Sequence, residues 1–185
     1  MNITETSLPG VVLVNVDKFS DPRGSFHETW HQERYAGLGL PSNFVQDNVS
    51  SSISGVLRGL HFQNPHAQGK LVQVLQGEVF DVAVDLRIGS PTFGKWFGAT
   101  LTAEKGTQMF IPEGFAHGFL TLSDLAIFSY KCTDFYSKAS EKTLRWDDPD
   151  IGIIWPLKDP LLSEKDRAGS LLKDMPREEL FVFGR

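Results

Sequence analysis

Residues 55–70, GVLRGLHFQNPHAQGK, hold a high density of side chains that can bind ligands or move protons. The segment around His61 is otherwise apolar or β-forming, which predicts a buried strand that carries polar groups. An unpaired polar group in a core costs about 1–3 kcal/mol, so a strand built only for stability would carry Val or Ile instead. The stretch therefore predicts one wall of a site, with candidate residues Arg58, His61, Gln63, His66, Gln68 and Lys70.

The strand expected over residues 56–63 places Arg58 and His61 on opposite faces, because side chains alternate along a regular strand. Both can meet one pocket only if the strand is bulged between them. Gly59 lies between them and is the residue type that a bulge favours. The alternative is a core His61 bonded to a backbone carbonyl, with Arg58 at the rim.

Three further polar residues fall in phase with apolar neighbours on other predicted strands, namely Lys70, His117 and Tyr130. A Lys on the inner face of a strand is rare unless it is paired, and Asp81 on the next strand is a plausible partner. The alternatives are a Lys that reaches solvent from the end of its strand, and a core Tyr whose hydroxyl is satisfied.

An interior that holds His61, Lys70 and Tyr130 together fits removal of a proton next to a carbonyl group, through an enolate. His supplies a general base near neutral pH, Lys can stabilise an oxyanion, and Tyr can donate a proton. Arg23 and Arg58 can neutralise phosphate. The pattern therefore fits an enzyme that removes a proton next to a carbonyl group.

The sequence offers little for a metal or a thiolate mechanism. Jelly-roll metal sites usually begin with two His separated by one residue on a strand, whereas His61 is followed by Phe and Gln, and His66 comes only after Pro65. The single cysteine, Cys132, has no His close to it in the sequence. We therefore expect no metal and no cofactor.

The overall composition is that of one globular domain of 185 residues, 41% hydrophobic and 22% charged. A net charge of −5 argues against a nucleic-acid partner, and no apolar run is long enough to span a bilayer. One cysteine and no signal-peptide pattern predict a cytoplasmic protein.

Short alternating segments separated by turn signals predict a mainly β protein, with a jelly roll as the leading choice. A helix is expected over residues 31–38, a hairpin around Gly77, a capped helix from Ser163 with Asp166 in its first turn, and another short helix after Asp174. The predicted strands cover residues 11–16, 25–30, 44–49, 56–63, 71–76, 79–86, 96–101, 107–111, 115–122 and 126–133.

The apolar run over residues 11–16 precedes a barrel that is complete without it, so it needs the edge of another sheet. We expect that edge to come from a second copy of the chain, which predicts a dimer built through the N-terminal strand.

Six blocks of the sequence resemble the dTDP-4-dehydrorhamnose 3,5-epimerase family. They lie in order over nearly the whole chain, without large gaps. The blocks are DPRGSF at 21–26, FVQDNVS at 44–50, GVLRGLHFQ at 55–63, IPEGFAHGF at 111–119, YKCT at 130–133 and LSEKD at 162–166.

The resemblance implies a cupin-type jelly-roll barrel with short C-terminal helices, as a single domain over residues 1–185 that works as a metal-free homodimer. It implies an N-terminal arm, about residues 1–30, exchanged in the dimer, and a helical tail at about 160–185. The implied reaction is epimerisation of dTDP-4-dehydro-6-deoxy-D-glucose at C3 and C5, on the route to dTDP-L-rhamnose for lipopolysaccharide or cell-wall polysaccharide.

By the same resemblance His61 is the base and Asp166 orients it, Lys70 faces the C4 oxygen, and Tyr130 is the acid on the opposite face of the sugar. Phe19, Arg23 and Glu28 are implied to come from the partner subunit. The other implied substrate contacts are Gln46, Asn48, Arg58, His117, Glu141 and Lys165.

Three alternatives remain open from the sequence. A relative of the same build can epimerise only one carbon. A metal-dependent cupin would contain bound iron, manganese or zinc. A non-catalytic module would bind the sugar nucleotide without exchanging protons, but it leaves buried His61, Lys70 and Tyr130 without a purpose.

Overall fold

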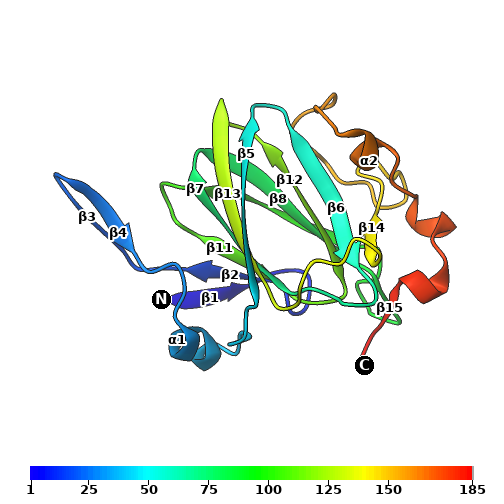
Figure 1. Cartoon of the computed structure of the whole chain (residues 1–185), viewed down its shortest axis with the longest axis horizontal. Coiled ribbons are helices and arrows are strands. Elements are labelled where there is room, and N and C mark those ends of the chain that lie inside the picture. The colour runs from blue at the N-terminus through cyan, green and yellow to red at the C-terminus, as the bar shows by residue number, and fades with distance from the viewer. Residues whose placement is uncertain (185) are drawn as a thin grey trace.

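The computed structural model describes residues 1–184 and consists mainly of two antiparallel sheets packed face to face (Figure 1). This architecture confirms the predicted mainly β, jelly-roll fold. The six-stranded sheet has the order β1 (Asn2–Glu5), β2 (Val12–Asn15), β11 (Gln108–Ile111), β7 (Lys70–Gln76), β13 (Leu125–Cys132), β5 (Gln46–Ile53). The five-stranded sheet has the order β10 (Trp96–Thr102), β8 (Glu78–Asp85), β12 (Phe115–Thr121), β6 (Leu57–Gln63), β14 (Glu141–Thr143).

The main core lies between the two sheets and follows from strand alternation. Val72 and Val74 of β7 meet Ala83 of β8 and Phe119 of β12 there, and all four are at most 4% exposed. A second core lies on the outer face of the five-stranded sheet, where the C-terminal segment covers it with residues such as Met175. Strand β8 is therefore buried on both faces.

The predicted hairpin around Gly77 is wrong, because β7 and β8 belong to opposite sheets. Val74 and Val79 pack in the same core from the two sides, so apolar side chains rather than backbone hydrogen bonds join these consecutive strands. Both hydrogen-bonding edges of each strand are already occupied by other strands. Gly77 allows the tight crossing, with φ +79° and no room for a Cβ beside the Leu125 carbonyl.

The predicted helix near residues 31–38 is confirmed as α1 (Gln32–Gly37), which begins after the N-cap His31. Its Tyr35 is fully buried against the outer face of the six-stranded sheet and donates its hydroxyl to Gln108 Oε1 at 2.8 Å. This contact fixes α1 to β11 of the six-stranded sheet.

The C-terminal segment contains α2 (Glu164–Arg167), η1 (Leu172–Asp174), η2 (Arg177–Glu179) and β15 (Phe181–Val182), which pairs with β9 (Arg87–Ile88). Ser163 caps α2 by accepting from the Asp166 backbone N–H at 3.1 Å, as predicted. The short helix expected after Asp174 is the single 3₁₀ turn η2, with Pro176 at its N-cap.

The apolar run at residues 11–16 needs no second chain for its edge, which corrects the reason we gave for a dimer. Strand β2 within it pairs with β1 on one side and with β11 of the same chain on the other. The segment that pairs with neither main sheet is the following hairpin. Its strands β3 (Lys18–Asp21) and β4 (Gly24–His27) pair only with each other, and the hairpin projects away from both sheets (Figure 1). No helix among the described residues is long and apolar enough to cross a membrane.

Candidate active site

A bulge in β6 brings Arg58 and His61 into one cavity, which is one of the two arrangements that the sequence left open. His61 lies opposite His117 of β12 and Arg58 lies opposite Phe119, so two residues of β6 face one residue of β12. Gly59 has φ +117°, and a Cβ there would lie 2.6 Å from the Gly118 Cα. Only glycine fits this turn of the backbone.

His61 is held by a carboxylate from the other end of the chain. Its Nε2 lies 2.5 Å from Oδ1 of Asp166, which is 3% exposed at the start of α2. Ser163 donates its hydroxyl to the other oxygen of Asp166 at 2.7 Å. The alternative of a core His61 bonded to a backbone carbonyl is therefore wrong, and Asp166 both takes part in the cap and orients the imidazole.

The protonation states of this pair suit a general base. Burial lowers the pKa of His61 below its ordinary 6.5, while the hydrogen bond and the charge of Asp166 act in the opposite direction. Burial alone would raise the pKa of Asp166, but the hydrogen bonds from His61 and Ser163 outweigh it and lower that pKa. At neutral pH the imidazole is thus mostly neutral beside an ionised carboxylate.

Two adjoining pockets of about 360 and 200 Å³ meet at His61 between the sheets. The side chains common to both pockets are His61, Lys70, Tyr130, Tyr136 and Glu141. The larger pocket also contains Arg58, His117, Lys165 and Asp166, and the smaller one Gln46, Asn48, Gln63 and Gln68.

Lys70 is 9% exposed at the start of β7 and faces this cavity. Burial lowers its pKa, and the nearby Cys132, Asp81 and Glu141 counteract that shift. The direct Lys70–Asp81 pair that we expected is wrong, because within the described residues the Asp81 carboxylate is hydrogen-bonded to Nε2 of His117 instead. Lys70 therefore presents its amine to the cavity.

Tyr130 lies on β13 and reaches the cavity from the opposite sheet to His61. Burial raises the pKa of its hydroxyl, so the group keeps its proton at neutral pH. The arrangement sets a neutral base and a protonated acid on two walls of one cavity.

Polar residues at the mouth of the cavity form a connected rim. Lys165 pairs with Glu141 at 2.7 Å, and the Tyr136 hydroxyl donates to the same carboxylate at 3.1 Å. Gln46 donates to Asn48 at 3.0 Å within β5. The predicted contacts on β5, β6, β12, β14 and α2 are thus brought together around His61.

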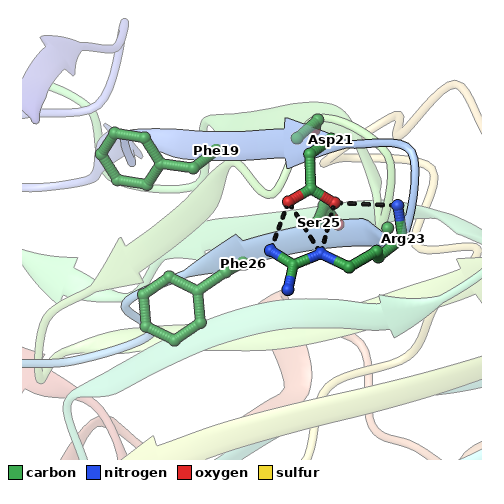
Figure 2. A pocket seen from close by; sticks show the side chains of 7 residues that line it. Phe19, Asp21, Arg23, Ser25 and Phe26 are labelled. Atoms are coloured by element: carbon green, nitrogen blue, oxygen red, sulfur yellow. Dashed lines mark hydrogen bonds and ion pairs between the residues drawn. The ribbon is translucent and has the colours of Figure 1, made fainter.

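The projecting hairpin keeps three other predicted residues away from this cavity. Phe19 of β3 lies opposite Phe26 of β4, and their rings lie on the same side of the hairpin, 67% and 72% exposed (Figure 2). The side chain of Arg23 is bound to Asp21 at 2.6 Å in the hairpin's turn (Figure 2).

Glu28 follows the hairpin and pairs with Arg34 at 3.2 Å. Within the described residues neither pocket around His61 includes Glu28, Phe19 or Arg23. The hairpin instead borders a shallow hollow of about 390 Å³ of its own. A single chain therefore lacks three of the contacts that the family resemblance implies.

Sequence reasoning missed three residues of the site. Tyr136 lies in an irregular loop, where neither strand phase nor a motif gave a signal. Ser163 was recognised as a cap but not as a donor to the Asp166 side chain. Asp81 was considered as a partner of Lys70, and the sequence gave no signal for its contact with His117, because β8 and β12 are neighbours only in the folded sheet. Among the described residues, no group of three or more His, Cys, Asp or Glu side chains is placed to hold a metal.

Comparisons with known proteins agree with this geometry. Residues 5–174 match the family described as dTDP-4-dehydrorhamnose 3,5-epimerase. The enzyme of that name from Pseudomonas aeruginosa is 54% identical over 176 residues, which cover 94% of this chain and 97% of the relative. The one from Neisseria gonorrhoeae is 56% identical over 91% of this chain, which spans only 52% of that longer relative.

A solved structure shares the whole architecture. The dTDP-6-deoxy-D-glucose-3,5-epimerase from Legionella pneumophila, crystallised with dTDP-4-keto-L-rhamnose, superposes with a TM-score of 0.96 at 48% identity, covering 100% of this chain and 99% of that one. The family match spans most of the chain, and the sequence identity to these relatives is far above the level expected by chance. The chain belongs to the dTDP-4-dehydrorhamnose 3,5-epimerase family.

Proposed function

We propose that this protein epimerises dTDP-4-dehydro-6-deoxy-D-glucose at C3 and C5, in the synthesis of dTDP-L-rhamnose. The observation that carries the proposal is the His61–Asp166 pair facing Lys70 and Tyr130 across one cavity, in a chain of this family. A binding module would not need a neutral imidazole, a buried amine and a protonated phenol around one space.

His61 acts as the base in this proposal. The C4 ketone acidifies the C–H bonds at C3 and C5, so removal of either proton gives an enolate. The Asp166 carboxylate holds the imidazole in one orientation and stabilises the imidazolium that forms when the proton is taken. The amine of Lys70 stabilises the negative charge that develops on the C4 oxygen.

Tyr130 completes the inversion. Epimerisation requires that a proton leaves one face of the sugar ring and another arrives on the opposite face. Tyr130 and His61 come from opposite sheets, so they approach the ring from different walls of the cavity. The protonated phenol is therefore the acid.

The remaining polar residues of the cavity bind the nucleotide and the diphosphate. Arg58 and Lys165 supply positive charge on the side of the larger pocket, and the amides of Gln46 and Asn48 supply hydrogen bonds at the smaller one. Glu141 completes these contacts, and His117 contacts the substrate from β12 on the side of the sugar. No metal ion or cofactor takes part, and the protein works in the cytoplasm, for which its single cysteine is suited.

A homodimer supplies the contacts that one chain lacks. The β3–β4 hairpin projects from the body with two exposed Phe rings and Arg23 at its turn (Figure 2). A two-stranded hairpin that stands alone with two exposed aromatic rings is at best marginally stable without another surface. We assign that surface to the partner's cavity, so that Phe19, Arg23 and Glu28 of one chain complete the site of the other.

The proposal is tested by adding the purified protein, dialysed against a strong chelator, to dTDP-4-dehydro-6-deoxy-D-glucose and following the sugar by NMR. Formation of dTDP-4-keto-L-rhamnose, at the same rate before and after dialysis, is expected. Inversion at a single carbon would identify a mono-epimerase. Activity that returns only with an added divalent ion would contradict the metal-free mechanism, and an unchanged sugar would contradict the function.

A further inference from the structure

A second His–carboxylate pair lies beside the first one. His117 of β12 is the direct cross-strand neighbour of His61, and its Nε2 lies 2.9 and 3.1 Å from the two oxygens of Asp81. Asp81 is fully buried on β8, and the His117 ring stacks on Phe128 with the planes 17° apart. The imidazole is thus fixed on its face and at one nitrogen.

The contact with Asp81 decides which nitrogen of His117 carries the proton. An ionised carboxylate can only accept hydrogen bonds, so Nε2 must be the donor. Burial raises the pKa of Asp81 above its ordinary value, and the contact with His117 and the charge of Lys70 act in the opposite direction, so the geometry of the contact decides the assignment. Two short contacts from one nitrogen are what a single N–H shared between two carboxylate oxygens produces.

The other ring nitrogen is available to a ligand. Among the described residues, Nδ1 of His117 forms no hydrogen bond. The polar side-chain atoms that are both fully buried and without a partner there are Trp30 Nε1, Ser50 Oγ and Thr121 Oγ1, so Nδ1 is not cut off from solvent. His117 lines the larger pocket, so Nδ1 is reached from that pocket. In a neutral imidazole that donates from Nε2, Nδ1 is an acceptor.

We propose that Asp81 is a positioning residue that keeps the ring proton of His117 on Nε2, and that His117 Nδ1 thereby accepts from a hydroxyl of the bound sugar. The sugar assignment rests on the proposed function. The proposed tautomer does not, because it follows from the contacts of the unliganded protein.

The charges around the cavity favour a hydroxyl over a phosphate at this position. Arg58, Lys70 and Lys165 already line the same pocket as cations, and they can meet a diphosphate. A ring nitrogen that accepts a hydrogen bond offers no donor to an anion. It can instead discriminate sugars, because a buried acceptor left without its donor weakens binding of an analogue that lacks the hydroxyl.

The tautomer is tested directly by two-bond proton–nitrogen NMR of the protein labelled with nitrogen-15 at histidine. The resting protein is expected to show His117 protonated at Nε2 and unprotonated at Nδ1. Asp81→Asn can donate its amide to Nε2 and so move the proton to Nδ1, as the corresponding change does in serine-protease triads. A wild-type ring protonated at Nδ1, or an Asp81→Asn spectrum identical to the wild type, would overturn the inference.

Activity is tested with His117→Gln as the matched variant. The Gln amide can still donate to Asp81, so the buried carboxylate stays paired, but the acceptor at the Nδ1 position is lost. Both Asp81→Asn and His117→Gln are expected to lower kcat/KM about tenfold or more, as for one lost hydrogen bond in a closed site. Because Asp81 acts through His117, the double variant should lose no more than His117→Gln alone; fully multiplied losses would contradict the positioning role.

Binding of dTDP alone separates the sugar from the diphosphate. His117→Gln is expected to bind dTDP with wild-type affinity, because dTDP carries no sugar hydroxyl for Nδ1. A tenfold weaker dTDP complex would place His117 on the diphosphate and overturn the assignment. If the wild-type protein epimerised no sugar at all, the proposed function would fail while the NMR result on the tautomer still stood.

Discussion

At the scale of single residues, the cavity separates a base from an acid. His61 is buried, neutral and held by Asp166, whereas Tyr130 stays protonated on the other sheet. Burial lowers the pKa of His61 and the Asp166 carboxylate raises it, and burial has the larger effect. One measurement tests the acid, and a second tests the base.

Replacing the acid should uncouple exchange from inversion. Tyr130→Phe keeps His61 and Lys70, so the enolate can still form, but no group returns a proton to the opposite face. We expect full epimerisation to fall about 10²–10⁴-fold, while some solvent deuterium still enters at C3 or C5. The readout is NMR of the sugar in D₂O, and wild-type epimerisation by Tyr130→Phe would reject Tyr130 as the acid.

The acid limb of the pH profile should report His61. The base must be neutral in the free enzyme, so kcat/KM should fall as the pH drops through a pKa below 6.5. The charge of Asp166 raises that pKa, so Asp166→Asn should move the limb to lower pH, with a lower plateau because the ring is less well oriented. Ser163→Ala serves as a milder control, since it keeps the Asp166 carboxylate and removes only the two hydrogen bonds that the Ser163 hydroxyl makes with Asp166. A limb that moves to higher pH in Asp166→Asn would contradict this account.

At the scale of the elements, the bulge in β6 decides whether Arg58 and His61 share a cavity. Gly59→Ala would place a Cβ within 2.7 Å of the His117 carbonyl oxygen, at a backbone φ of +117°. We expect about 2 kcal/mol or more of lost stability in denaturant unfolding, together with lost activity.

Gly37→Ala is the matched control, because a Cβ at this position in α1 would meet nothing within 4 Å. It should leave the stability unchanged or raise it slightly, since Ala is the better helix former. Equal effects of the two substitutions would mean that the bulge has no special requirement for glycine.

The elements also show what the sequence could predict. The phase of β6 and the glycine between Arg58 and His61 indicated where a bulge could lie, because both are local properties, but they did not decide between a shared cavity and a core His61. The crossing at Gly77 was not predictable, since a hairpin and a crossing between sheets share the same turn residue and the same alternation. The pairing of β2 with β11 and of Asp81 with His117 likewise depends on which distant strands become neighbours.

At the scale of the whole molecule, one chain holds the reacting groups and carries the missing contacts on a hairpin that points elsewhere (Figure 1). The resemblance assigned Phe19, Arg23 and Glu28 to the partner subunit, and strand alternation alone could not have done so. The dimer therefore remains a proposal whose sharpest consequence is a site shared between two chains.

Mixing two inactive variants tests that shared site. His61→Ala lacks the base but carries a complete hairpin, and Arg23→Ala has the base but lacks the hairpin cation. After unfolding and refolding together at equal amounts, half of the dimers are mixed and each has one intact site, so about a quarter of the wild-type activity should return. Activity that stays at the level of the separate variants would place Arg23 in its own chain's site or outside any site.

The central claim, that His61 is the base which forms the enolate, is tested most directly by deuterium wash-in. The protein is incubated with dTDP-4-dehydro-6-deoxy-D-glucose in D₂O, and deuterium at C3 and C5 is read by NMR. The wild-type protein should incorporate deuterium at both carbons. His61→Ala should bind dTDP but incorporate deuterium at neither carbon above the rate without enzyme. Exchange by His61→Ala at the wild-type rate would show that another group removes the proton and would contradict the mechanism.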